Sequence, residues 1–405
     1  WCVTGVQTCA LPICPSNFVD PPSLSATQGI LSGDMDHMSS TYGKSPRVHE
    51  WSLNLQHEVR NFLIDLAYVG NRGQRLNSSV DINQLPSSRL VLGDLLGRRI
   101  TDPAVVAAGF TKPYAAFPDT QTLAQALRPF PQFFGVISRN SGHGKTWYDA
   151  FQAKLERRFG DWQLLSSYTF SKSLAANHYR QIFSQHFNVG AQDAYNLDDM
   201  KSYLPFDQPH ILNVLSSYEL PVGKGKKFLN SDNRAVNFLI GGWNVSAALQ
   251  YRSGVLFQVA TPGNPLGNGV LFSRLTKANQ VNSTIRTGVD YSTLDPGNTS
   301  VRFFNSGASA PYASAPRYTL GTAALYHSAF RQPMVREENI SISKRFRWEL
   351  NDTRAIDFVY RADMFNLFNR TNFGVNGAIG NAAFGAATGP QSGPRIITMG
   401  LRLDF

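Results

Sequence analysis

Residues 397–405 read Ile-Thr-Met-Gly-Leu-Arg-Leu-Asp-Phe, with an apolar side chain at every odd position and a small or polar one at every even position. Such alternation predicts a β-strand with one apolar face and one polar face. A tilted strand of nine or ten residues, rising about 3.3 Å per residue, crosses roughly 25 Å, the height of the apolar band of a bilayer. The stretch therefore predicts a strand that is long enough to cross a membrane.

Similar alternation recurs upstream in pairs of segments that are joined by short turns. The pairs are residues 51–56 with 62–68, 151–156 with 162–170, 211–218 with 239–251, and 340–342 with 356–364. The links between them contain Arg60-Asn61, Phe159-Gly160-Asp161, a Gly/Lys-rich segment and Asn351-Asp352. Each pair predicts a β-hairpin, and with the last segment the sequence predicts about nine strands.

Long connections separate the hairpins. They cover residues 71–145, 173–207, 253–336 and 369–393. Connections of this length argue against a compact soluble domain, whereas outer-membrane barrels have short periplasmic turns and long outward loops. With Phe405 on the periplasmic side, every short turn falls inside and every long connection outside. We therefore predict an all-β protein, an antiparallel transmembrane β-barrel with long extracellular loops.

Strand parity predicts that this barrel is partial. A barrel with both ends in the periplasm needs an even number of strands, and the first strand found, from Trp51, runs toward the periplasm. At least one upstream strand is therefore expected, either missing or within residues 15–48. Because an open edge of unpaired backbone groups is unstable in lipid, we predict about 9–10 strands of a larger barrel.

The N-terminus is expected to be foreign to this domain. Residues 3–13 (Val-Thr-Gly-Val-Gln-Thr-Cys-Ala-Leu-Pro-Ile) resemble the translation of a sequencing adapter, and all three cysteines, Cys2, Cys9 and Cys14, lie in or beside them. We therefore predict that residues 1–14 are an artefact and that residues 15–405 are part of one barrel domain. On this interpretation the gene is truncated upstream.

Composition excludes some classes of protein. No stretch approaches about 18 consecutive apolar residues, so a membrane-spanning helix is excluded. The chain has 38 Lys and Arg against 28 Asp and Glu, a net charge of +10. These basic residues are scattered and accompany no nucleic-acid-binding motif, so no nucleic acid is expected as a partner. They are suited instead to anionic lipopolysaccharide outside or to anionic solutes in the lumen.

Seven short segments together resemble a known family over nearly everything after about Val48. They are residues 68–73 (Tyr-Val-Gly-Asn-Arg-Gly), 148–159 (Tyr-Asp-Ala-Phe-Gln-Ala-Lys-Leu-Glu-Arg-Arg-Phe), 167–172 (Ser-Tyr-Thr-Phe-Ser-Lys), 206–210 (Phe-Asp-Gln-Pro-His), 241–243 (Gly-Gly-Trp), 253–254 (Ser-Gly) and 361–373 (Arg-Ala-Asp-Met-Phe-Asn-Leu-Phe-Asn-Arg-Thr-Asn-Phe). In order, spacing and position before a terminal Phe, this set resembles Oar-like TonB-dependent receptors.

The resemblance implies an outer-membrane barrel of a Gram-negative bacterium, with 22 strands and an N-terminal plug. Such receptors bind or import large external ligands and are energised by the TonB-ExbB-ExbD system. Members of this subgroup often carry a carboxypeptidase-regulatory-like domain ahead of the plug. The plug, the TonB contact and this domain are absent from the sequence, so transport is expected of the full-length receptor.

Several polar and aromatic residues have expected structural roles. Aromatic rings near strand ends are expected at the headgroup level of the membrane; these are Trp243, Tyr251, Tyr218 and Phe170. Arg361 and Asp363 share the polar face of one strand with Asp357, where an ion pair is expected to be structural. Asn366, Asn369 and Asn372 are expected to end this strand and shape the outward turn, with direct ligand contact as the alternative.

No catalytic, cofactor-binding or metal site is predicted, and the chain is not expected to be an enzyme. Asp198-Asp199 are hard oxygen ligands without further partners, so a solvated loop is favoured over a cation site. His178 and His186 lack the spacing of metal ligands, and His210 is expected to be a structural histidine at a strand start. Residues 223–227 (Gly-Lys-Gly-Lys-Lys) lack the spacing of a phosphate loop and predict a basic periplasmic turn.

Three classes of function remain open from the sequence. The first is a receptor or transporter barrel that captures an external ligand. The second is a passive porin or a surface adhesin, which would be favoured by an upstream sequence without a plug. The third is a secreted all-β enzyme acting on carbohydrate, which needs paired carboxylates on a closed scaffold and would have to keep large apolar strand faces in water.

Overall fold

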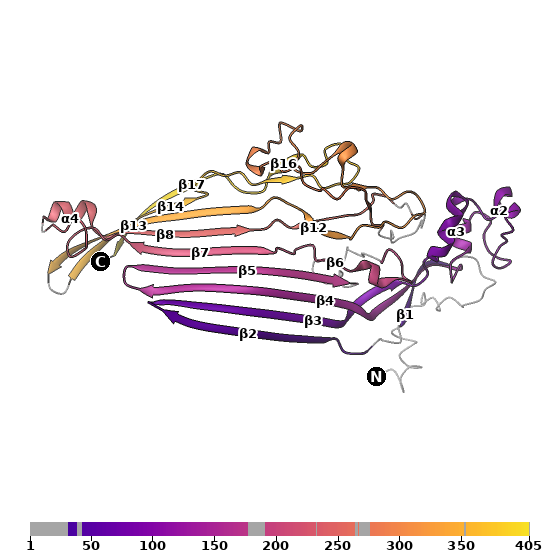
Figure 1. The fold of residues 1–405 in the computed structure, drawn as a ribbon, viewed down its shortest axis with the longest axis horizontal. Coiled ribbons are helices and arrows are strands. Elements are labelled where there is room, and N and C mark those ends of the chain that lie inside the picture. The colour runs from indigo at the N-terminus through magenta and orange to yellow at the C-terminus, as the bar shows by residue number, and fades with distance from the viewer. Residues whose placement is uncertain are drawn as a thin grey trace, which may run out of the picture.

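The computed structural model describes residues 31–38, 43–176, 191–231, 233–263, 266, 276–351 and 354–404. Its main feature is an eleven-stranded sheet (Figure 1), whose main path runs through nine strands in chain order, each antiparallel to the next. They are β2 (Arg47–Val59), β3 (Phe62–Asp81), β4 (Phe133–Phe159), β5 (Trp162–Ala176), β7 (His210–Glu219), β8 (Trp243–Arg252), β13 (Val335–Asn351), β14 (Arg354–Phe365) and β17 (Ile396–Asp404). The prediction of about nine antiparallel strands is confirmed.

Tight turns join the strands at one end of the sheet, which we call the turn end. Between β2 and β3 the two linking residues, Arg60 and Asn61, both have positive φ, 46° and 71°. Two-residue hairpin links of this kind match the right-handed twist of the flanking strands. Gly160 (φ 65°) serves the β4–β5 turn. The third predicted two-residue turn includes Asp352, which lies outside the described residues.

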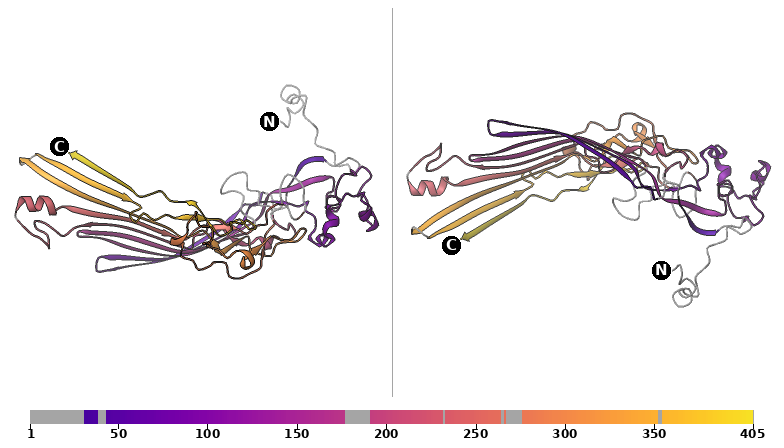
Figure 2. Two further views of the ribbon diagram at one scale, coloured as in Figure 1. Left: turned by 90° about the horizontal axis from the view of Figure 1, so that it is seen from above. Right: turned by 90° about the horizontal axis from the view of Figure 1, so that it is seen from below.

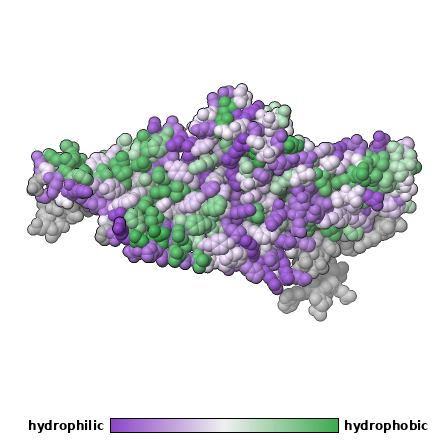
Figure 3. Space-filling view, viewed as in Figure 1, coloured by the Kyte–Doolittle hydropathy of each residue, from purple (hydrophilic) through white to green (hydrophobic). Residues whose placement is uncertain are grey.

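The sheet has one apolar and one polar face, as alternation requires. Leu55, Leu66 and Ala153 are register neighbours on the apolar face, where Leu53 and Leu401 are 73% and 70% exposed. Figure 3 shows hydrophobic side chains gathered over the left half of the sheet, near the turn end. On the opposite face polar groups pair across strands, as where Asn54 Nδ2 donates to Asp65 Oδ1 at 2.8 Å.

The sheet is open along both edges in the described part of the chain. β2 and β17 form the two ends of the main path and do not pair with each other; Figure 2 shows them spread apart at the turn end. β1 (Leu31–Met38) falls in the range where an upstream strand was expected. It pairs in parallel with the first part of β4 and does not extend the edge at β2.

The β7–β8 turn differs from its prediction. A strand was expected from residue 239, but residues Arg234–Ile240 form the helix α4, and β8 begins only at Trp243. The Asn233 side chain caps this helix by accepting from Ala235 N (2.9 Å) and Val236 N (3.3 Å). Gly242, with φ of 72°, then turns the chain into β8.

At the other end of the sheet, the loop end, four long connections carry short elements. We call residues 82–132 the first, 177–209 the second, 253–334 the third and 366–395 the fourth connection. Their elements are η1 (Ser87–Gly97), α2 (Pro103–Ala107), α3 (Leu123–Ala126), η2 (Leu197–Met200), β6 (Ser202–Tyr203), β9 (Leu256–Gln258), β10 (Asn279–Gln280), η3 (Tyr291–Thr293), η4 (Gly307–Ser309), β11 (Tyr312–Ala313), β12 (Tyr326–Arg331), β15 (Phe373–Val375) and β16 (Ala387–Pro390).

The first connection is shorter than predicted, because β3 continues to Asp81 and β4 begins at Phe133. Three two-stranded sheets form outside the main sheet, from β10 with β11, β12 with β9 and β15 with β16. No helix in the described part of the chain is long and apolar enough to span a membrane.

Candidate functional site

The third and fourth connections fold around a shared aromatic core. Phe304 and Phe330 are completely buried, and their ring centroids lie 4.8 Å apart. Phe257 lies 5.1 Å from Phe330, and Phe384, from the fourth connection, lies 5.8 Å from it. Aromatic pairs of this kind stabilise beyond the effect of area burial alone. The two connections therefore form one folded unit.

The first connection has an apolar core of its own that reaches the third connection. Leu96, Val105 and Phe117 are buried within it, and Tyr318 and Leu266 of the third connection belong to the same cluster. The two connections approach each other closely at Gly97, since a Cβ there would lie 2.5 Å from Tyr318 Oη. The first and third connections are thus packed together.

Gln192 joins the second connection to the third. Its Oε1 accepts from Lys277 N at 2.8 Å and from Gly321 N at 3.0 Å, and its Nε2 donates to Gly321 O at 3.0 Å. Lys277 is 2% exposed, and its Nζ lies 2.7 Å from Asp199 Oδ1. In addition, Gln84 of the first connection donates to Ala191 O at 2.9 Å. Buried polar groups must be paired, so these bonds fix three connections relative to one another.

A second buried ion pair fixes the root of this unit on the sheet. The side chains of Asp207 and Arg331 are 1% and 6% exposed, and Arg331 Nη2 lies 3.1 Å from Asp207 Oδ2. Arg331 also donates to Ser328 O, Asp207 O and Gly254 O. Asp207 Oδ1 accepts from the backbone of Ser173, at the end of β5, at 2.8 Å. The second and third connections are thereby attached to β5.

Burial shifts the pKa of three groups in the third connection. It lowers the pKa of the His327 imidazole and raises that of the Tyr312 hydroxyl above its usual range. Burial, and then the nearby charge of Arg331, lowers the pKa of the Arg286 guanidinium. Since His327 Nδ1 accepts from Ala329 N at 3.3 Å, the imidazole is neutral in this geometry.

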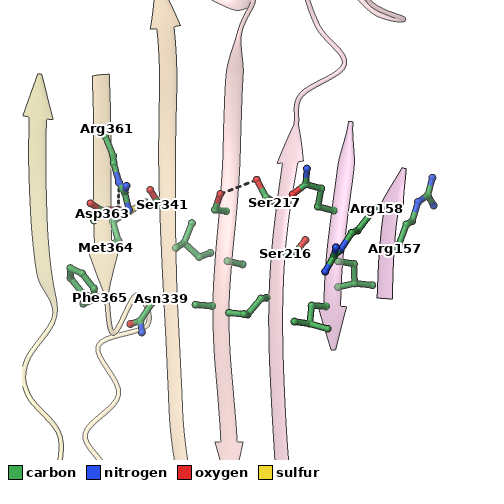
Figure 4. Close-up of a pocket in the computed structure, with 18 of the residues that line it drawn as sticks. Arg157, Arg158, Ser216, Ser217, Asn339, Ser341, Arg361, Asp363, Met364 and Phe365 are labelled. Atoms are coloured by element: carbon green, nitrogen blue, oxygen red, sulfur yellow. Dashed lines mark hydrogen bonds and ion pairs between the residues drawn. The ribbon is translucent and has the colours of Figure 1, made fainter. Parts of the chain in front are cut away.

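The polar face of the sheet contains a hollow of about 410 Å³. Its lining residues come from β4, β5, β7, β8, β13 and β14, and Figure 4 shows their side chains spread across these neighbouring strands. Arg361 and Asp363 form an ion pair, Nε to Oδ1 at 2.9 Å, while Ser217 and Ser246 hydrogen bond at 3.2 Å. The hollow is open and shallow, with alcohol, amide and charged groups around its edges.

An apolar row crosses the floor of this hollow. Leu165, Leu215 and Ala248 are neighbours in the register of β5, β7 and β8. Phe365, on β14, lines the same hollow. Leu215 and Phe365 are 51% and 48% exposed. Large exposed apolar side chains on an otherwise polar face mark a surface for contact.

Metal chemistry finds no support among the described residues, which contain no group of three or more His, Cys, Asp or Glu able to hold an ion. Several acidic side chains near the loops, including Asp199 and Asp207, are used in ion pairs. Glu338 Oε1, for example, lies 3.1 Å from Arg370 Nε.

Comparison with protein families decides what kind of sheet this is. A model described as an outer membrane beta barrel domain matches residues 3–398. The chain belongs to the outer membrane beta barrel domain family. It is accordingly a protein of the outer membrane, whose apolar sheet face contacts lipid and whose polar face lines the lumen. Its turn end is periplasmic and its long connections are extracellular.

Among solved structures, this barrel chain is similar to the pyoverdine outer membrane receptor FpvA from Pseudomonas aeruginosa PAO1 bound to pyoverdine, at 10% identity and a TM-score of 0.37, over 89% of this chain and 30% of that chain. It is also similar to the outer membrane transporter YddB from Escherichia coli, at 9% identity and a TM-score of 0.36, over 91% of this chain and 34% of that chain. The chain therefore spans about a third of the length of these two structures. No curated protein sequence matches it.

Several predicted residues of the barrel lie where they were expected. Arg361 and Asp363 pair on the lumen face. β14 ends at Phe365, and Asn366 and Asn369 follow with φ of 51° and 49°. Asn366 Oδ1 accepts from Arg370 N at 2.8 Å.

The third asparagine and three of the four aromatic residues also lie where the sequence predicted. Asn372 Nδ2 donates to the backbone of Arg336 at 3.0 Å, so its amide stabilises the turn. Trp243 begins β8, and Tyr218 and Tyr251 are the penultimate residues of their strands. Phe170 differs, because β5 continues beyond it to Ala176.

The predictions for polar loop residues have different outcomes. Asp199 is not simply solvated, because it holds buried Lys277, while Asp198 lies 3.4 Å from Lys145 Nζ. His210 begins β7, with Nδ1 2.8 Å from Tyr168 Oη. His178 and His186, the N-terminal segment 1–14 and Phe405 lie outside the described residues.

The polar contacts made by Gln192, Lys277 and Arg331 were not predicted from the sequence. Each lies in a connection without periodicity, and its partners are distant along the chain. The one available signal was Asp207 within the segment Phe-Asp-Gln-Pro-His, which belongs to the set that resembles a known family but does not identify a partner for Asp207.

Proposed function

We propose that this chain is part of the barrel of an Oar-like TonB-dependent receptor, which binds an external ligand at its extracellular connections and imports it. In this proposal residues 1–14 derive from a sequencing adapter, and residues 15–405 are the C-terminal part of the barrel domain. The receptor would work with a plug and the TonB-ExbB-ExbD system, both supplied by sequence upstream. Lipopolysaccharide would surround its basic outer surface, and no catalytic role is proposed.

The exposed apolar row on the lumen face carries this proposal. A passive porin has a polar, water-filled lumen, in which side chains such as Leu215 and Phe365, each about half exposed, would contact water at a cost. A plug domain packed inside the barrel would cover them. The row therefore favours a plugged receptor over a porin or a passive adhesin.

The packed extracellular connections support a ligand-binding role. The buried ion pairs of Lys277 and Arg331 hold the second and third connections in fixed positions. A surface that is ordered before binding loses little conformational entropy when a ligand arrives. This suits capture of a ligand from dilute solution.

Two experiments test the proposal in sequence. The source DNA is first read upstream of the codon for Pro15, where we expect further strands, a plug and a signal peptide. In the recovered full-length protein, Leu165→Asp is then compared with Gln163→Asp, its neighbour on the same strand and lumen face.

We expect Leu165→Asp to loosen the plug and raise single-channel conductance in planar bilayers, while Gln163→Asp leaves the channel closed. An upstream gene without a plug, or an open channel in the unaltered protein, would assign the chain to the porins instead. Equal conductance of the two variants would remove the argument from the apolar row.

A further inference from the structure

The β7–β8 turn is unusual among the periplasmic links, because it spans residues 220–242 and carries α4, whereas the β2–β3 and β4–β5 links have two residues each. Its helix lies against the outside of the barrel. The rings of Phe238 and Phe346 stack at 4.6 Å, and Phe346 is in register with Phe358 and, through it, with Leu403 on the lipid-facing side. α4 therefore packs on the lipid-facing surface at its periplasmic end (Figure 1).

Lys344 explains why a helix is held at this position. This lysine lies on the same lipid-facing side of β13, yet it is only 2% exposed. Its Nζ donates to Leu239 O, at the C-terminal end of α4, at 2.8 Å, and lies 4.9 Å from the Trp243 ring. A charge facing lipid is costly unless it is paired, and helix C-terminal carbonyls attract cations. The turn thus covers a charged group at the membrane boundary.

Trp243 is bound to the same carbonyl, since its Nε1 donates to Leu239 O at 3.1 Å. Tryptophan side chains concentrate at the headgroup level of membranes. The contacts with Trp243 and Lys344 therefore place α4 at the height of the periplasmic headgroups, next to the hydrocarbon band.

The outer surface of this turn is apolar, and its large side chains stay more than one-third exposed even though Phe238 contacts Phe346. Its exposed side chains are Phe228 (52%), Leu229 (65%), Val236 (36%), Phe238 (56%) and Leu239 (68%). Figure 3 shows a hydrophobic patch at the place of α4, at the left end of the molecule. Because the helix packs on the lipid-facing side of β13, the patch adjoins the surface that already contacts lipid.

Charge identifies the kind of lipid. Residues 220–242 contain Lys224, Lys226, Lys227 and Arg234 against Asp232, so their net charge is 4 − 1 = +3. Lys226 is held by Asp161 and Glu219, both at 3.0 Å, and the side chains of Lys224 and Lys227 are solvent-exposed. We propose that the β7–β8 turn is an interfacial anchor that inserts Phe228, Leu229 and Leu239 into the periplasmic leaflet and binds anionic phospholipid headgroups.

Fluorescence quenching in vesicles tests this anchor. The full-length protein recovered by the upstream sequencing, with its cysteines replaced by serine, is folded into vesicles of phosphatidylethanolamine and phosphatidylglycerol, and bimane is attached at Leu239→Cys. Nitroxide lipids labelled at the headgroup or at the end of the acyl chain report the depth of the probe. Val91→Cys, an 87% exposed apolar position in the extracellular first connection, is the lipid-free control, and Leu401→Cys marks the hydrocarbon band.

We expect the probe at residue 239 to be quenched by the headgroup label more than by the chain-end label, with no quenching at residue 91. Replacing Lys224 and Lys227 by glutamine should lower the local enrichment of spin-labelled phosphatidylglycerol by about five-fold per lysine. Quenching at residue 239 no greater than at residue 91 would overturn the anchor and leave a periplasmic protein as the partner of the patch.

Three further outcomes would also refute the anchor. A probe at residue 239 as deep as the one at residue 401 would place the turn in the hydrocarbon and not at the interface. An unchanged phosphatidylglycerol enrichment in the lysine variants would remove the anionic headgroup from the proposal. Absence of quenching at residue 401 would instead show that the barrel itself had not inserted, which would contradict its lipid-facing assignment and the anchor together.

Discussion

Replacing Arg331 by methionine should release the root of the extracellular connections from the barrel. The substitution keeps an unbranched apolar stem but removes donors to four acceptors: Ser328 O, Asp207 O, Gly254 O and Asp207 Oδ2. It also leaves the Asp207 carboxylate, 1% exposed, without its cation. Removing one partner of a buried ion pair costs about 3–5 kcal/mol. The local free energy of unfolding where the connections join the barrel should fall by about 3 kcal/mol, the lower end of this range, because water reaches a loop more easily than a protein core.

Hydrogen exchange followed by mass spectrometry can measure this loss locally. The Ser173 amide donates to Asp207 Oδ1, and the Leu256 amide donates to Pro205 O at 3.0 Å. A loss of about 3 kcal/mol corresponds to roughly 100-fold faster exchange where local opening limits the rate. The control is Arg98→Met, which breaks an exposed pair with Asp102 at 3.4 Å and should change exchange little.

A second substitution separates lost contacts from the unpaired charge. Adding Asp207→Asn to Arg331→Met removes the charge while keeping an oxygen that accepts from Ser173 N. Protection of the Ser173 amide should then recover in large part. If Arg331→Met and Arg98→Met accelerate exchange equally, or if the double variant is worse than the single one, the buried ion pair does not hold these connections.

Three more predictions concern the same extracellular unit. Lys277→Met should destabilise the contact between the second and third connections by about 1–2 kcal/mol. Lys145→Met, which breaks the exposed pair with Asp198, should have almost no effect. The rates of limited proteolysis of the two variants test this difference. Gly321→Ala would put a Cβ 1.7 Å from Lys277 O and should cost about 3 kcal/mol or more, while Gly389→Ala meets nothing within 4 Å; equal thermal unfolding of the two would contradict the close approach. Burial lowers the pKa of His327 below 6.5, so the unfolded state binds more protons than the folded state. The contribution of His327 to stability should therefore be complete above pH 6.5 and be lost as the pH falls from 6.5 toward the folded-state pKa. His327→Gln should abolish this pH dependence in unfolding curves measured between neutral and mildly acidic pH.

The barrel strands could be predicted because their signal is local. Each strand alternates between lipid-facing apolar residues and lumen-facing polar residues in its own sequence. Along the main path of the sheet, neighbouring strands also follow one another in chain order. Hence Leu55 and Leu66 could be placed on one face before their pairing was known, and Arg361 and Asp363 on the other. The short turns added an independent signal, as at Arg60 and Asn61, whose positive φ angles fit a two-residue hairpin.

The extracellular unit could not be predicted, because its contacts join residues far apart in sequence. Gln192 bonds to Gly321, 129 residues away, and Arg331 pairs with Asp207, 124 residues away. No periodicity marks such positions. The error at α4 is of another kind, since Asn233 before the helix and Gly241-Gly242 after it are recognisable helix boundaries. The strand was instead predicted to begin at residue 239, within what the structure shows to be the helix.

Both ends of this barrel contain buried, paired cationic side chains, but the surroundings of these cations differ. At the extracellular end, Lys277 and Arg331 are buried within protein and paired with carboxylates, so their charges hold connections together. At the periplasmic end, Lys344 faces lipid and is paired with a helix carbonyl, so its charge holds a turn against the barrel. A cation without such a partner would be costly at either end, but only Lys344 would then be exposed to hydrocarbon. The position of α4 therefore depends on the surrounding lipid as well as on contacts within the protein.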